Sequence, residues 1–213
     1  MFPKAVCAAV LSILVSAPSF AQAIDQQSTA SNSGRYVNYN TGQSFTPTMN
    51  QSLGAGVFVG SDPFGRAYTT EMTVKLFGGG LPNNGGTELA AAIVTQFVAG
   101  STFTWVDAFW SAPVNVIPGT KYYLSFLDSH DQDLAYRLEF RIQQSDVYAG
   151  GNLVFAGNTT PGAPYSDIAT YDLAFREFGS NAAVVATPEP ASLVLLGTGL
   201  VGVIAVRRRR QRA

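Results

Sequence analysis

One short polar stretch gathers the residue types that metal sites and hydrolases use. Residues 128–133 contain the chain's only histidine, His130, and three carboxylates, Asp128, Asp131 and Asp133. Closely spaced carboxylate oxygens suit Ca²⁺, although the loop glycine and the terminal glutamate of an EF-hand are missing. No Gly-x-Ser-x-Gly segment supplies a serine that His130 would activate. We therefore expect a solvated loop between two strands and no cofactor, with a Ca²⁺ ion on the three aspartates as the alternative.

Four glutamates are candidates for acid–base chemistry on a glycan. Glycoside hydrolysis needs two carboxyl groups about 5 Å or about 6.5–9.5 Å apart, and the candidates are Glu71, Glu88, Glu139 and Glu177. Nothing in their spacing brings two of them together. Glu139 alternates with the apolar Leu138 and Phe140, which predicts an exposed position on one face of a sheet. A polysaccharide hydrolase is therefore the alternative, and a protein without enzymatic activity is the expectation.

An aromatic cluster offers a different kind of chemistry. Phe103, Trp105, Phe109 and Trp110 lie close together in the chain. Exposed rings can stack on sugar rings because their faces are apolar and broad, whereas buried rings belong to a core. We expect most of the cluster in the core, and we take Trp105 and Trp110 as the candidate glycan-binding residues. Phe103 and Trp105 should share a face, and Trp110, beyond an expected bend, should be the more exposed tryptophan.

The N-terminus differs from the segment that would position these residues. Lys4 is followed by an apolar run over residues 5–15 and then by small residues up to Ala23. This is the order of a secretory signal peptide. We predict a signal peptide over residues 1–23, cut by signal peptidase after Ala23, with a cut after Ala21 as the alternative.

The C-terminal tail has three parts in a fixed order: a Pro-Glu-Pro motif, an uncharged run and an arginine cluster. They occupy Pro188, Glu189 and Pro190, residues 191–206, and Arg207, Arg208, Arg209 and Arg210. As a transmembrane helix the run is roughly 24 Å long, short against a hydrocarbon core of about 30 Å, and arginine side chains can reach out to the interface. The arginines should stay cytoplasmic, which places the preceding domain outside.

This tail, residues 187–213, resembles the PEP-CTERM sorting signal. The resemblance implies that an exosortase-type membrane enzyme recognises and processes the tail, in Gram-negative bacteria that make exopolysaccharide. It also implies a protein that is exported, transiently anchored in the inner membrane, and then retained at the cell envelope or outer surface, or secreted. A plain C-terminal anchor, which needs no Pro-Glu-Pro motif, is the alternative. The resemblance indicates a route and not what the cargo domain does.

The segment between the two ends, residues 24–186, is long enough for one domain. It holds seven basic and thirteen acidic residues, a net charge near −6, because six of the thirteen basic residues lie in the ends. An acidic domain argues against nucleic acid or an anionic lipid surface as a partner. The only cysteine, Cys7, lies in the predicted signal peptide. The domain should therefore be held together by burial, without a disulfide.

Short strand-like runs between turn residues dominate this domain. They cover residues 68–77, 102–109, 121–127, 135–142, 153–155 and 173–178. The segment 88–99 is the best helix candidate, but its β-branched residues and flanking glycines favour a strand. Eight or more strands predict an all-β fold, a jelly-roll-like β-sandwich, with an immunoglobulin-like topology as the alternative. In the last run Leu173 and Phe175 should point inward, and Asp172, Ala174 and Arg176 outward.

Four segments of the domain also resemble secreted bacterial jelly-roll modules. They are residues 43–46 (Gln-Ser-Phe-Thr), 122–124 (Tyr-Tyr-Leu), 148–151 (Tyr-Ala-Gly-Gly) and 172–176 (Asp-Leu-Ala-Phe-Arg). The resemblance implies a shape like that of carbohydrate-binding domains and carries no catalytic motif. We therefore expect a non-enzymatic component of the exopolysaccharide matrix or a glycan-binding protein, with a structural adhesin as a further alternative.

Overall fold

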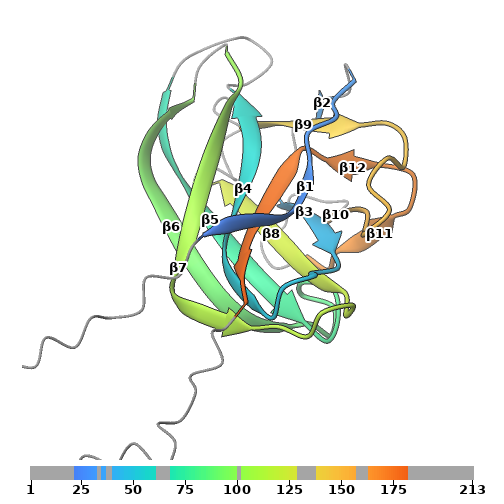
Figure 1. Ribbon diagram of the computed structural model, residues 1–213. Coiled ribbons are helices and arrows are strands. Elements are labelled where there is room, and N and C mark those ends of the chain that lie inside the picture. The colour runs from blue at the N-terminus through green and yellow to red at the C-terminus, as the bar shows by residue number, and fades with distance from the viewer. Residues whose placement is uncertain are drawn as a thin grey trace, which may run out of the picture. The chain divides into compact units, whose positions relative to one another are not determined.

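The strands of the domain form two antiparallel sheets (Figure 1). The computed structural model describes residues 22–32, 35–36, 40–60, 68–99, 102–128, 138–156 and 163–181. Within these ranges the chain is all-β, and no helix there could cross a membrane. The predicted tail helix, and all of the predicted signal peptide except its last two residues, lie outside the described residues.

The first sheet is built around a central strand, β4. In the described ranges its strands are, in spatial order, β1 (Ala23–Ser28), β13 (Phe175–Ser180), β4 (Gln51–Gly60), β9 (Glu139–Gln143) and β12 (Asp172–Leu173), with β7 (Thr104–Asn115) paired to β4 and β2 (Arg35–Tyr36) paired to β9. β7 pairs with β4 from Asn115 opposite Gln51 to Thr104 opposite Val59. Because a strand has two edges, β13 and β9 share the other edge of β4.

The second sheet contains a long hairpin at one edge. Its described strands are, in spatial order, β11 (Ser166–Ile168), β10 (Leu153–Phe155), β3 (Asn40–Phe45), β8 (Tyr122–Asp128), β5 (Tyr68–Gly78) and β6 (Thr87–Ala99). β5 and β6 form the hairpin, and Gly79, Asn83 and Gly85 in its turn have positive φ angles. Glycine and asparagine tolerate this conformation better than other residues. β6 confirms that residues 88–99 are a strand and not a helix.

The inner faces of the two sheets share one hydrophobic core. Ala55, Val57 and Val59 of β4 are fully buried in the first sheet, as are Val74 and Leu76 of β5 in the second. These residues lie two apart along their strands, as expected when one face of a strand is buried. Two antiparallel sheets packed on one core fit a β-sandwich. All the described residues belong to one unit, which ends at Asn181.

Strands occur where apolar and polar residues alternate clearly in the sequence, but two strands, β3 and β4, lack this alternation. The predicted runs at 68–77, 121–127 and 153–155 correspond to β5, β8 and β10. β4, in contrast, alternates glycine with small apolar residues, and β3 is mostly polar although all of it is buried. Hydrophobic periodicity therefore does not predict β3 or β4.

In β12, β13 and the residue between them, one prediction about which side chains face outward is wrong. Leu173 and Phe175 are buried as expected, but Asp172 and Ala174, which the alternation places outside, are also fully buried. A carboxyl group tolerates burial only when hydrogen bonds replace its lost hydration. Partners for Asp172 must therefore come from elsewhere in the fold.

The buried Asp172 carboxyl joins three of the motif segments. Val147 N and Tyr148 N each donate to its Oδ2 at 2.9 Å, and Gln43 Nε2 donates to its Oδ1 at 3.2 Å. Gln43 Oε1 in turn accepts a hydrogen bond from Leu173 N at 2.8 Å. Burial raises the pKa of Asp172, while these hydrogen bonds act to lower it. The segments that begin near Gln43, Tyr148 and Asp172 thus meet around one network, which gives them a structural role.

Candidate functional site

The outer face of β4 is almost bare of side chains. Its inward residues are apolar and buried, whereas the positions that alternate with them are Gly54, Gly56, Phe58 and Gly60. Side chains from the flanking strands β7 and β13 therefore reach over β4 from both sides. The contacts between them form a surface that neither strand could form alone.

An ion pair crosses β4 above Gly56. The register places Gly56 between Asp107 of β7 and Arg176 of β13. Arg176 donates from Nε to Asp107 Oδ1 at 2.7 Å and from Nη2 to Oδ2, so the planar groups pair through two charge-assisted bonds. A Cβ atom at position 56 would lie 1.9 Å from Asp107 Oδ1. Glycine is therefore the residue that leaves room for this pair.

Aromatic rings flank the ion pair. Arg176 Cζ lies 4.6 Å from the ring centroid of Trp105 and 5.4 Å from that of Phe178, distances at which a ring face attracts a cation. Phe178 contacts Phe109, with centroids 5.0 Å apart. The register places both phenylalanines opposite Gly54. A second glycine of β4 therefore lets side chains meet across the strand.

The row continues toward β9. The Phe58 ring lies 5.3 Å from Trp105 and 5.8 Å from Phe103, centroid to centroid, and Arg141 Cζ lies 4.2 Å from the centroid of Phe103. From Phe103 to Phe109 the row follows about 20 Å of strand. We call this set the aromatic face, and it consists of Phe58, Phe103, Trp105, Asp107, Phe109, Arg141, Arg176 and Phe178.

The aromatic face is partly open to solvent. Phe109 is 47% exposed, and Phe103 and Trp105 are half-buried. The side chains of Arg176 and Asp107 are 23% and 24% exposed. Rings can stack on the apolar side of a ligand while the planar ion pair exchanges hydrogen bonds with its hydroxyl groups. The structure confirms that Phe103 and Trp105 share a face. The expectation that most of the cluster lies in the core is wrong, because Phe103, Trp105 and Phe109 are all partly exposed.

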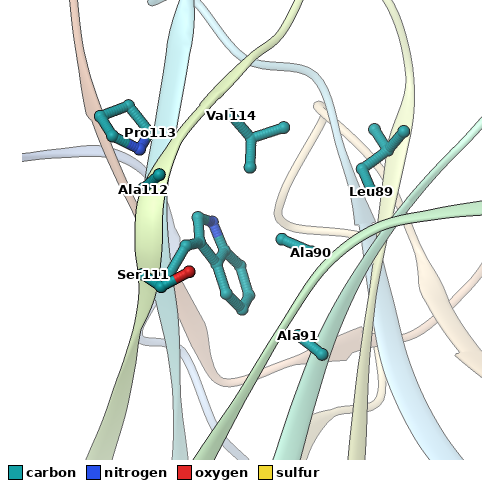
Figure 2. Close-up of a pocket in the computed structure, with 8 residues that line it drawn as sticks. Leu89, Ala90, Ala91, Ser111, Ala112, Pro113 and Val114 are labelled. Atoms are coloured by element: carbon teal, nitrogen blue, oxygen red, sulfur yellow. The ribbon is translucent and has the colours of Figure 1, made fainter.

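Trp110 does not belong to this face, contrary to the prediction. It is only 8% exposed, and its Nε1 donates to Ser52 Oγ at 3.1 Å. Trp110 lies on the same inward face of β7 as Val106 and Ala108, although the register of β7 against β4 shifts directly after Phe109. It lines a cavity of about 340 Å³ between β6 and β7 (Figure 2). Trp110 is therefore a core residue at the border of a cavity.

Two of the four candidate glutamates lie far apart on the second sheet. Glu71 and Glu88 are both exposed, and Glu88 forms an ion pair with Lys75 at 3.0 Å. Glu88 stands opposite Phe77, six residues along β5 from Glu71. At the rise of a strand this is roughly 20 Å. The pair is thus too widely separated for glycoside hydrolysis.

The other two glutamates lie on opposite faces of the first sheet. Glu139 neighbours the inward Phe140 and faces outward, whereas Glu177 neighbours the outward Arg176 and faces inward. Glu139 is only 2% exposed, so the prediction of an exposed residue is wrong. Alternation fixes the face of a side chain but not what covers that face, which is why the sequence could not predict this burial.

Glu177 is an unusual buried acid. It is fully buried, and neither carboxyl oxygen meets the geometry of a hydrogen bond with a described residue. Burial raises the pKa of Glu177 to about 8, the nearby Ser52 hydroxyl acts in the opposite direction, and the charge of Asp25 adds to the rise. The group is therefore protonated at neutral pH, where an ionised carboxylate would carry a large desolvation cost.

The predicted Ca²⁺ ligands are only partly described. Asp128 accepts hydrogen bonds from Thr70 Oγ1 at 2.8 Å and from Leu138 N at 2.9 Å, which gives it a role in the fold. Asp131 and Asp133 lie outside the described residues, and so does His130. Within the described ranges no group of three His, Cys, Asp or Glu residues could hold a metal ion. The Ca²⁺ site stays a prediction.

The tail defines the class of protein. The family model of the PEP-CTERM protein-sorting motif matches residues 186–210, which include the Pro-Glu-Pro motif and the four arginines. No curated protein matches the chain. A chain in which this motif follows an all-β domain is an exported protein that is sorted through an exosortase-type enzyme. The chain thus carries the PEP-CTERM sorting motif, and its tail anchors it transiently in a membrane before processing.

Proposed function

We propose that this exported protein binds an extracellular glycan through the aromatic face. The observation that carries the proposal is the row of partly exposed rings around the Arg176–Asp107 pair. A sugar ring has an apolar side of C–H groups and a rim of hydroxyl groups. The faces of aromatic rings can stack on the C–H side of the sugar, and a planar donor–acceptor pair can exchange hydrogen bonds with its hydroxyl groups. About 20 Å of strand suits several sugars of a polymer better than one free monosaccharide.

The charge of the domain bears on which polymer it could bind. Seven basic residues stand against thirteen acidic ones in residues 24–186, which disfavours nucleic acid. On the aromatic face itself Arg176 is paired with Asp107, so stacking and hydrogen bonding, not net charge, would dominate recognition. The sorting route resembles that of bacteria that make exopolysaccharide. The proposed ligand is therefore the polysaccharide that surrounds the producing cell.

We also propose a jelly-roll-like fold and an outer-surface or matrix location for this domain. The two sheets would form a jelly-roll-like β-sandwich. In support of this, the segments around Gln43 and Asp172 resemble segments of secreted bacterial jelly-roll modules, and they meet in one hydrogen-bond network. The tail helix over residues 191–206 would hold the protein in the inner membrane until the tail is processed. The domain would then remain at the outer surface or enter the matrix as a non-enzymatic component. No cofactor takes part in this function.

Replacement of Trp105 tests the glycan site. We expect Trp105→Ala to weaken retention on the native exopolysaccharide about tenfold or more, because a central tryptophan is commonly worth about 2 kcal/mol of binding or more. The measurement is affinity electrophoresis in gels with and without the polysaccharide. Ile117→Ala is the matched control, since Ile117 is 66% exposed and lies outside the aromatic face.

Two results would contradict the proposal. Unchanged retention of Trp105→Ala would place glycan binding elsewhere on the protein. Failure of the wild-type protein to bind the native polysaccharide, or any glycan on an array, would remove the binding function and leave the structural adhesin. Release of reducing ends from the polysaccharide, lost in a Glu→Gln variant, would instead support the hydrolase.

A further inference from the structure

A wide bulge in β7 lies beside the start of β6. β7 pairs with β4 at Phe109 and again at Val114, whose partners in β4 are only two positions apart. Four residues of β7, 110–113, therefore stand opposite the single residue Leu53. Pro113 has no N–H to give to a ladder, which favours an interruption at this point. Bulges of this kind are common next to functional sites, because they move a strand away from its partner.

The bulge forms one wall of a cavity whose other wall is β6. The cavity has a volume of about 340 Å³, at the lower end of the range of about 300–1,000 Å³ in which proteins hold small molecules. Leu89, Ala90 and Ala91 line it from β6. Figure 2 shows Ala90 and Ser111 on opposite sides of the gap, with the Ser111 hydroxyl turned toward it. Two successive alanines thus leave space that larger side chains would fill.

The wall of this cavity is more polar than its side chains suggest. Among the described residues that line it none is charged, and Ser111 carries the one hydroxyl group. The indole N–H of Trp110 is already used, because it donates to Ser52 Oγ at 3.1 Å. Polar atoms nevertheless form more of the open wall than apolar atoms do, and backbone N–H and C=O groups account for the rest. Such groups need hydrogen-bond partners, which water or a ligand supplies.

This lining selects a neutral ligand that carries hydroxyl groups. A charged molecule would lose hydration without gaining an ion pair. A hydrocarbon chain would fill the space but leave the backbone groups without partners, at a cost for each group that it buries. A hexose offers hydroxyl groups to the backbone and to Ser111, and an apolar C–H side to the Trp110 ring and the alanines.

We infer that the cavity between β6 and the bulge of β7 binds one neutral sugar residue. Leu89, Ala112 and Pro113 at its rim are exposed, so a free sugar or the end of a chain can enter from solvent. The site is separate from the aromatic face, because Trp110 lies on the inward face of β7 and Trp105 on the outward face. The inference therefore does not rest on glycan binding by the aromatic face.

Tryptophan fluorescence of the full chain tests this site. The chain contains two tryptophans, so Trp105→Phe leaves Trp110 as the only one. The probes are glucose, galactose and mannose, with 1-hexanol and glucuronate as the apolar and the charged comparison. We expect at least one hexose to shift the Trp110 emission saturably, with a dissociation constant on the order of 1–10 mM, because a single small ligand makes few contacts. Neither comparison compound should produce the shift.

Two cavity-filling variants of the Trp105→Phe protein locate the binding. Ala90→Leu fills the cavity from β6, and Ser111→Leu fills it from β7 at an exposed position, where a larger side chain does not disturb the core. We expect each to weaken hexose binding about tenfold or more, because the leucine occupies the space of the sugar. Thr95→Leu is the matched control, since Thr95 is exposed on β6 and does not line the cavity.

Three results would overturn the inference. They are the absence of a shift with all three hexoses, a shift with 1-hexanol or glucuronate but with no hexose, and a hexose shift that survives both filling variants. None of them bears on the aromatic face, which is tested by the retention of Trp105→Ala on the polysaccharide. The two proposals can therefore fail separately.

Discussion

Two glycines of β4 govern the aromatic face at the scale of single residues. Gly56 leaves the space in which Arg176 reaches Asp107, and Gly54 does the same for the rings of Phe109 and Phe178. Alternating glycines at 54, 56 and 60 are visible in the sequence. They could have indicated a bare strand face, but not which side chains cross it, because Arg176 and Asp107 are 69 residues apart.

Substitution of Gly56 should damage the face more than the fold. In Gly56→Ala the new methyl group would overlap Asp107 Oδ1, the end of a side chain that can rotate away. We expect a loss of about 1–3 kcal/mol in the free energy of unfolding, together with weaker glycan retention than wild type. Urea denaturation and affinity electrophoresis measure the two effects.

Gly60→Ala is the matched control for Gly56→Ala. A Cβ atom there would lie 3.2 Å from the Phe103 ring, a tight contact that a small shift relieves. Its effect on glycan retention should be smaller. If the two alanine variants retain the polysaccharide equally well, the ion pair above Gly56 has no part in binding.

The buried acid Glu177 predicts a pH dependence of stability. Its ordinary pKa of 4.5 rises to about 8 in the folded protein. Between these two pH values the unfolded chain releases the proton and the folded chain keeps it. Stability should therefore fall as the pH rises through this window and level off above pH 8, by at most about 1.4 kcal/mol per pH unit.

Glu177→Gln should remove this contribution. The amide cannot ionise, so the difference in unfolding free energy between pH 5 and pH 8 should be smaller in the variant than in wild type. Asp172, whose pKa is also raised by burial, contributes with the same sign in both proteins and cancels in the comparison. Urea denaturation at the two pH values is the measurement. An unchanged pH dependence in Glu177→Gln would show that Glu177 is ionised in the folded state.

Residue-level prediction succeeded where a signal is local and failed where burial depends on distant partners. Trp105 shares a face with Phe103, as two aromatic residues two apart on a strand predict, but the spacing did not predict that this face is partly exposed. Trp110 is buried because it lies on the inward face of β7 and because Ser52, 58 residues away, accepts its N–H. Asp172 is buried because Gln43, 129 residues away, supplies a donor. No pattern near either residue carries that information.

At the scale of the elements, the Asp172 network ties β3 and β12 to the loop before β10. We expect Asp172→Ala to cost roughly 2–4 kcal/mol in the free energy of unfolding, because it leaves the N–H groups of Val147 and Tyr148 and the Gln43 amide without their acceptor. Thermal and urea denaturation measure the loss.

Asp167→Ala is the control for the network. Asp167 is exposed and accepts one hydrogen bond, from Asn152 Nδ2 at 2.8 Å. An exposed contact of this kind is usually worth less than about 1 kcal/mol. Equal losses in the Asp167 and Asp172 variants would contradict the central role of the buried carboxyl.

The strands that could be predicted best are those in which apolar and polar residues alternate most clearly. β8 shows a clear period of two, and its Leu124 and Phe126 are fully buried as expected. β4 has no such pattern, because glycine fills its outer positions, and β3 is polar because its side chains join hydrogen bonds inside the fold. β-branched residues and flanking glycines were enough to favour a strand for residues 88–99, despite a composition that also suits a helix.

At the scale of the whole molecule, the C-terminal sorting motif is the part that sequence reasoning predicted best. A Pro-Glu-Pro motif, an apolar run and an arginine cluster are contiguous, so no folding is needed to recognise them, and the family match covers residues 186–210. The aromatic face, by contrast, draws its residues from four strands and a loop that lie far apart in the chain. The proposed glycan site thus depends on long-range contacts, and the sorting motif does not.

The mass of the protein recovered from its own cells tests the export and processing account most directly. The full chain has a mass of 22.6 kDa. We predict a shorter species in intact-mass spectrometry, which begins near Ile24 and lacks the apolar run and arginines beyond the Pro-Glu-Pro motif. Recovery of the intact 213-residue chain from the cytosol, with both ends present, would contradict the account.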